Sequence, residues 1–179
     1  MKRPLTTLLA AALGLAACAT TSSQPVEGSQ FDLSSRGGSM SASCSGASCT
    51  GPQISVRAEG NQVRGLLGNQ AVNVTTSDKE VKGSVGSEPV QLQVRPQVDG
   101  LSINGTFAGQ LGSLQVADQY IQGRVGRCSY DLKAEGPNRY RGNRSCGGLP
   151  QPTFVTLPSN LAEKPQGQRA ALLAMLLSG

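Results

Sequence analysis

One recurring unit constrains the fold of this chain more than any other feature. It is a hydrophobic-x-Gly-x-hydrophobic run, followed by a turn and a second alternating run. It begins at Val63 in VRGLLGNQAVNV, at Val81 in VKGSVGSEPVQLQV, at Ile103 in INGTFAGQLGSLQV and at Ile121 in IQGRVGRCSYDL. Period-two spacing of apolar residues is typical of half-buried strands, and Gly-Asn, Asp-Gly and similar pairs between the runs indicate turns. The pattern predicts an all-β fold, an antiparallel meander of about ten short strands that forms a curved sheet, a barrel or a sandwich.

A β-solenoid is the alternative architecture. Gly65, Gly83, Gly105, Gly123 and Gly142 recur at intervals of 18 to 22 residues, and periods near 20 are also found in solenoids. The turn chemistry and the drifting interval favour the meander. An inward glycine in mid-strand weakens packing. We therefore expect each glycine to make room for a bulky neighbour or to bend the sheet.

The N-terminus has the parts of a secretory signal peptide. Lys2 and Arg3 form a basic start, and the apolar run that follows over residues 5–17 is too short to span a membrane. Residues 15–18, Leu-Ala-Ala-Cys, resemble the lipobox of bacterial lipoproteins, and the resemblance covers residues 1–18 only. It implies cleavage before Cys18, diacylglycerol on its thiol and an acyl chain on its amine. Ala19, where the inner-membrane retention signal of that class is Asp, implies the outer membrane rather than the inner one.

These features divide the chain into four parts. We expect a signal peptide over residues 1–17, the lipidated Cys18 with a Ser/Gly-rich flexible tether over 18–38, an all-β domain over 39–158 and a helical segment over 159–179. Within the tether, Phe31 and Leu33 form an isolated apolar pair. Residues 153–157 follow a proline-rich stretch and are expected to form an edge strand.

The C-terminal segment has the pattern of a helix. Asn160 and Glu163 have capping-box spacing, Pro165 suits a first turn, and the run Ala170–Leu177 is apolar on nearly all sides. Such a run is normally buried, most simply against the open end or a face of the sheet. Docking on a partner or insertion in the membrane interface is the alternative.

Four cysteines remain when Cys18 carries lipid: Cys44, Cys49, Cys128 and Cys146. An exported domain lies in an oxidising compartment, and four cysteines allow three pairings. A hairpin that turns around Pro137 places Cys128 opposite Cys146, and Tyr130 opposite Arg144 on one face, where the guanidinium can stack on the ring. The predicted disulfides are therefore 128–146 and 44–49. A metal site of four thiolates is the alternative, although neither pair has Cys-x-x-Cys spacing.

Charge and composition exclude several classes of function. The formal net charge of +5 falls to +3 when Lys2 and Arg3 leave with the signal peptide, which does not indicate a nucleic-acid binder. The absence of histidine removes the commonest general base and transition-metal ligand. Most acidic residues lie in or near turns without a visible catalytic partner. We identify no catalytic, cofactor or metal site and expect a protein that is not an enzyme.

The last hairpin is locally basic. The simplest interpretation of these residues is a solvated strand face. The functional alternative is contact with anionic lipid headgroups or with an acidic envelope protein. The candidate contact residues are Arg127, Lys133, Arg139 and Arg141.

Two functions fit this sequence. The first is a membrane-anchored lipoprotein of the bacterial cell envelope that acts as a structural or interaction module. The second is a carrier whose barrel lumen holds a lipid or another small apolar ligand. A filled interior would favour the module, whereas a lumen of several hundred cubic ångströms would favour the carrier.

Overall fold

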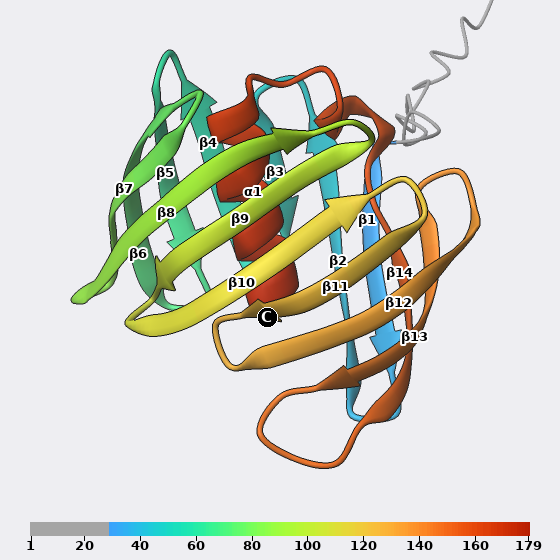
Figure 1. The fold of residues 1–179 in the computed structure, drawn as a ribbon. Helices are drawn as coiled ribbons and strands as arrows, with labels where there is room; N and C mark the ends of the chain where they lie inside the picture. Colours follow the sequence, from blue (N-terminus) through green and yellow to red (C-terminus); the bar gives the residue numbers. More distant parts are fainter. Residues whose placement is uncertain (1–28) are drawn as a thin grey trace, which may run out of the picture.

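A computed structural model of the protein describes residues 29–179. The predicted signal peptide, Cys18 and the first part of the predicted tether lie outside the described residues. Fourteen strands, each antiparallel to its neighbour in sequence, close into one barrel (Figure 1). The strands are β1 (Gln30–Ser35), β2 (Gly38–Ser45), β3 (Ser48–Gly51), β4 (Ile54–Glu59), β5 (Gln62–Leu67), β6 (Gln70–Ser77), β7 (Glu80–Val85), β8 (Glu88–Gln97), β9 (Gly100–Phe107), β10 (Gln110–Ala117), β11 (Tyr120–Val125), β12 (Cys128–Gly136), β13 (Arg139–Ser145) and β14 (Gln151–Thr156).

The predicted antiparallel meander is confirmed, and the solenoid alternative is wrong. The number of strands is fourteen rather than about ten. The period-two pattern did not predict the additional strands β1, β2 and β3. Their buried positions include small or sulfur-bearing residues such as Ala42 and Cys44 instead of β-branched ones. Their outward positions are mostly serine, so these segments read as flexible chain.

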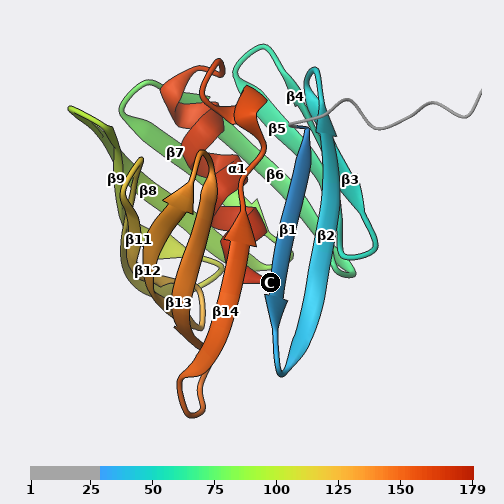
Figure 2. The same cartoon turned by 90° about the vertical axis from the view of Figure 1, so that its right-hand side faces the viewer.

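The predicted tether is wrong over residues 30–38. Phe31 and Leu33 are 0% and 2% exposed, and β1 pairs with both β2 and β14. Figure 2 shows β1 beside β14, where the barrel closes. The predicted edge strand at residues 153–157 is β14, and it has a partner on each side rather than a free edge. Pro152 is tolerated there because the ladder to β1 ends one residue later, at the pair Ser35–Thr153.

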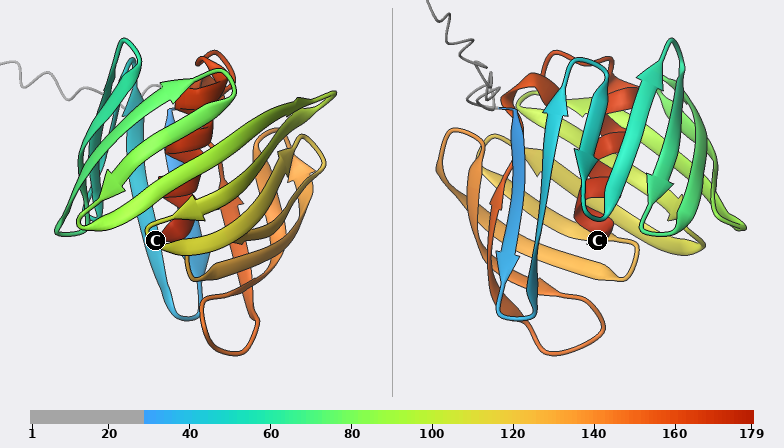
Figure 3. Two further views of the ribbon diagram at one scale, coloured as in Figure 1. Left: turned by 60° about the vertical axis from the view of Figure 1, so that its left-hand side comes forward. Right: turned by 180° about the vertical axis from the view of Figure 1, so that it is seen from behind.

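The C-terminal helix fills the barrel lumen. The 3₁₀ turn η1 (Ser159–Leu161) leads into α1 (Gln166–Ser178), which contacts β4 through β9 and β11 from inside (Figures 1 and 3). Every residue from Ala170 to Leu177 is at most 1% exposed. The helix is apolar around its whole circumference, and the lumen of a closed barrel surrounds it with apolar side chains. The predicted burial of the helix is confirmed, but the helix lies in the lumen rather than against the open end or a face of the sheet.

The predicted capping box at Asn160 and Glu163 does not form. Pro165 precedes the first residue of α1, and no side chain caps the helix. The Asn160 amide nitrogen instead donates to the main-chain oxygen of Cys44 at 2.6 Å, and Gln168 Nε2 donates to the oxygen of Gly60 at 2.6 Å. These polar contacts attach the start of α1 to the barrel rim.

The recurring glycines lie where adjacent strands approach closely. A Cβ at Gly65 would be 2.0 Å from the main-chain oxygen of Ser55, and one at Gly123 would be 2.0 Å from that of Ser113. Both glycines also have positive φ angles, +146° and +117°, which side chains rarely permit. The same approach recurs on every second strand from β5 to β13, at Gly65, Gly83, Gly105, Gly123 and Gly142. The glycines therefore allow adjacent strands to approach more closely than a side chain would permit.

The two ends of the barrel differ. At the near end, the chain enters at Ser29 and the turns follow even-numbered strands; at the far end, the turns follow odd-numbered strands and α1 terminates. Near-end acidic residues are Glu59, Asp78, Glu80, Asp99, Asp118, Glu135 and Glu163. The far-end turns instead carry Arg36 and Arg127, with Glu88 beside them. Acidic side chains are thus concentrated at the near end, where cations such as Lys79, Arg139 and Lys164 also lie.

Candidate binding site at the far end of the barrel

Two surface hollows flank the C-terminal end of α1. One has a volume of about 300 Å³ and includes Arg144; we call it the Arg144 hollow. The other, of about 550 Å³, lies over Leu67 and Phe107 and includes Arg127. Both are lined in part by Gln53 and Gly179. The far end therefore presents two concave surfaces beside the end of the helix.

The Arg144 hollow is formed by four separate parts of the chain. The segment around the β1–β2 turn contributes main chain and two hydroxyls, and the β3–β4 turn contributes an amide. The segment from the end of β13 to the start of β14 contributes the cation and a second amide, and the fourth part is Gly179, after α1. Asp and Glu side chains are not among its lining residues. These are Leu33, Ser35, Gly37, Gly38, Ser39, Met40, Gln53, Arg144, Cys146, Gly148, Leu149, Gln151 and Gly179.

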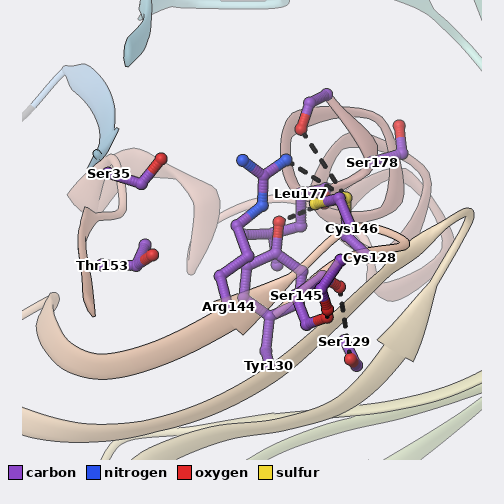
Figure 4. The surroundings of a disulfide bond; sticks show 12 residues. Ser35, Cys128, Ser129, Tyr130, Arg144, Ser145, Cys146, Thr153, Leu177 and Ser178 are labelled. Carbon is purple, nitrogen blue, oxygen red and sulfur yellow. Dashed lines mark hydrogen bonds between the residues drawn. A yellow bond between two sulfur atoms is a disulfide. The ribbon is translucent and has the colours of Figure 1, made fainter. Parts of the chain in front are cut away.

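The Arg144 side chain lies against residues of the barrel wall. Tyr130 on β12 is the register partner of Arg144, and the guanidinium carbon lies 5.7 Å from the centre of the Tyr130 ring. The predicted stacking is therefore confirmed. Nη2 of Arg144 donates to Sγ of Cys128 at 3.2 Å, while Nε is buried without a hydrogen-bond partner (Figure 4).

Tyr130 links this wall to the helix. Its hydroxyl donates to the main-chain oxygen of Leu177 in the last turn of α1. Burial raises the pKa of Tyr130 to about 12, against a smaller lowering effect of the Arg144 charge. The phenol therefore stays protonated at ordinary pH and keeps its donor role. The ring position, and with it the surface on which Arg144 lies, is set by the helix.

Both predicted disulfides are present. Cys44 and Cys49 join β2 to β3, and Cys128 and Cys146 join β12 to the residue after β13; the Cα atoms are 4.0 Å apart in each pair. The alternative metal site of four thiolates is wrong, because all four sulfurs are in disulfides. The second disulfide lies directly beside Arg144 (Figure 4).

The four residues of the predicted basic patch are not brought together. Lys133, Arg139 and Arg141 lie on the outer face of β12 and β13 towards the near end, and Lys133 is the register partner of Arg141. Arg127 precedes β12 and is at the far end. Arg141 also stacks over Phe154, 4.5 Å from the ring centre, and pairs with Glu135 at 3.1 Å. The outer patch therefore has three cations, one of which is paired.

A third hollow, of about 520 Å³, lies at the near end around Asp118 and Tyr140. The Tyr140 hydroxyl donates to the main-chain oxygen of Ala117 at 3.0 Å. Burial, and secondly the Asp118 charge, raise the pKa of Tyr140.

Sequence reasoning did not single out Tyr140 or the glutamines of the far end. These residues lie in turns or at strand ends distant in sequence, and no local pattern joins them.

No protein-family model, no curated protein and no solved structure matches the chain. Within residues 29–179, no helix has the length and apolar character needed to cross a membrane. The same residues contain no cluster of three or more His, Cys, Asp or Glu side chains suited to a metal ion.

Proposed function

We propose that this chain is a lipoprotein of the bacterial cell envelope, anchored in the outer membrane through Cys18, and that it acts as a structural or interaction module rather than as an enzyme. The occupied lumen carries this proposal. Because α1 fills the barrel with side chains at most 1% exposed, the outer surface and the rims remain available for recognition. The two disulfides support export, since such bonds persist in oxidising compartments.

The position of the first strand supports a definite orientation. Residues 19–28 separate Cys18 from the first described residue, Ser29, and a chain of this length reaches at most about 35 Å when fully extended. The chain joins the barrel at the near end. An anchor at Cys18 would therefore keep the near end within about 35 Å of the membrane, and we propose that the far-end hollows face the surroundings.

We further propose that, in this orientation, the outer patch contacts the membrane. Lys133, Arg139 and Arg141 lie towards the near end, where anionic headgroups would attract them by about 1 kcal/mol per cation. Arg127 would face away, towards an envelope partner. Acidic turns surround the patch, so we propose a local contact that supplements the lipid anchor.

The test of this proposal is to replace the anchor residue. In a bacterial host, the wild-type chain should sediment with membranes and have an intact mass that includes cleavage before Cys18 plus the acyl groups. Cys18→Ala should move the protein to the soluble extract, because removal of the acyl chains eliminates most of the binding energy. Ala19→Ser, next to the anchor, is the matched control and should remain with the membrane. A wild-type protein with an unmodified Cys18 thiol would refute the proposal.

The carrier for a lipid or other small apolar ligand remains the alternative. It would require α1 to leave the lumen, because the helix occupies the volume that a ligand would need. The contacts of Asn160 and Gln168 with the rim, and of Tyr130 with Leu177, would have to break. This requirement makes the carrier the weaker proposal.

A further inference from the structure

Arg144 is a cation without an acidic partner. The ion pairs of the described residues are Arg57–Glu59, Lys82–Glu80 and Arg141–Glu135, and Arg144 belongs to none of them. Its side chain is half-buried, and its Nε has neither solvent contact nor an acceptor. Removing a charged group from water is costly unless a counter-charge or hydrogen bonds replace the water. The Tyr130 ring face offsets only part of this cost.

The space beside Arg144 can accommodate such a counter-charge. The Arg144 hollow has a volume of about 300 Å³, at the lower limit of the roughly 300–1,000 Å³ typical of small-molecule sites. Ser39, Gln53 and Gln151 line the hollow together with Arg144, and their hydroxyl and amide groups can donate hydrogen bonds. The Ser35 hydroxyl already donates to the main-chain oxygen of Gly38. No Asp or Glu side chain lines the hollow, although the carboxyl group of Gly179 does.

The guanidinium is also held in position before any ligand binds. The disulfide from Cys128 to Cys146 fixes the sulfur that Nη2 contacts, and the Tyr130 hydroxyl is bound to the oxygen of Leu177. Little side-chain entropy would be lost on binding, because the cation is already positioned. Arginine presents several N–H donors in one plane, which match the two oxygens of a carboxylate or phosphate.

We infer that the Arg144 hollow is a binding site for an oxyanion group, a carboxylate or a phosphate, and that Arg144 is its principal ligand. The terminal nitrogens of the guanidinium hold the anion, since Nε is buried, and the hydroxyl and amide groups of the rim orient the rest of the molecule. This inference goes beyond the proposed function and does not depend on it. Binding in the hollow can be measured whether or not Cys18 carries lipid.

The direct test follows the arginine Nε–H signals of the full chain by NMR. Inorganic phosphate and acetate are titrated separately, with sodium chloride adjusted to keep ionic strength constant. We expect one Nε–H signal, absent in Arg144→Lys, to shift saturably with a Kd on the order of 1 mM. A response to phosphate alone assigns a phosphate ligand, and a response to both probes assigns a general oxyanion site. If no signal responds except to ionic strength, the inference is wrong.

Two variants locate the binding. Arg144→Lys keeps the charge but loses the planar fork, and it should bind at least about tenfold more weakly. Arg127→Gln removes a cation from the other far-end hollow and should leave the affinity within about twofold, because exposed charges are well screened. Equal losses in both variants would indicate general attraction to the far end and overturn the site. If Arg144→Lys does not fold, the wild-type titration still decides, and Gln151→Ala then tests the hollow.

Discussion

At the scale of single residues, the recurring glycines are explained by distances between backbones. A side chain at Gly65 would overlap Ser55 oxygen and approach the Cα of Val56 to 2.7 Å. The close contact is with main chain, which cannot rotate away as a side chain can. The close approach of neighbouring main chains therefore accounts for the glycine pattern without a ligand.

Replacement of Gly65 tests this account. We expect Gly65→Val to lower the free energy of unfolding by about 3 kcal/mol or more, from backbone strain and overpacking together. Gly136→Ala is the matched control, since Gly136 is also in a strand but a Cβ there meets nothing within 4 Å. The control should change stability by less than about 1 kcal/mol. Urea unfolding followed by circular dichroism measures both, and a Gly65→Val protein of wild-type stability would contradict the account.

At the scale of elements, α1 acts as the centre of the core. Every second residue of a strand points into the barrel, and these inward-facing side chains are largely Val, Leu and Ile. In a barrel of fourteen strands these side chains do not meet across the axis by themselves, because barrel diameter grows with strand number. The helix takes up the remaining volume. Its first turn is attached to the near rim through Gln168, and its last turn is attached to the barrel wall through Tyr130.

A cavity at the centre of α1 should therefore be costly. Leu173 is 1% exposed, and Leu173→Ala should lower the free energy of unfolding by about 2–5 kcal/mol, as is usual for a buried leucine. Glu163→Ala, in the exposed segment before the helix, should change it by less than about 0.5 kcal/mol. Thermal and urea unfolding provide the measurement. Similar stabilities for the two variants would show that α1 is not part of the core in solution.

At the scale of the whole molecule, the filled lumen separates the two candidate functions. Native mass spectrometry of the Cys18→Ala protein, which lacks the covalent anchor, should give the mass of the chain without bound lipid. The buried side chains of α1 already occupy the lumen, and protein interiors are normally close-packed. A lipid bound one-to-one would contradict this expectation and favour the carrier, with α1 displaced. Short-chain phospholipid is also added before a second measurement, and the measured mass should again be that of the chain alone.

Much of the architecture could be predicted from local pattern. The strands with β-branched residues, such as β6 and β8, were recognisable by periodicity, whereas β1 to β3 were not, because serine and small residues occupy their faces. For the candidate site, the hairpin register placed Arg144 over Tyr130 correctly. The remaining lining residues, such as Gln53 and Ser39, come from turns that no sequence spacing connects.

What the sequence by itself determined about this protein is local: the antiparallel meander, the pairing of its cysteines and the need to bury an all-apolar helix. These properties follow from side-chain period and hairpin register over neighbouring residues. The tertiary structure alone decided that β1 reaches β14, that α1 lies within the lumen and that the Arg144 hollow exists. Closure depends on the accumulated twist and bend of all strands. A surface that joins residues from opposite ends of the chain can appear only once the barrel is closed.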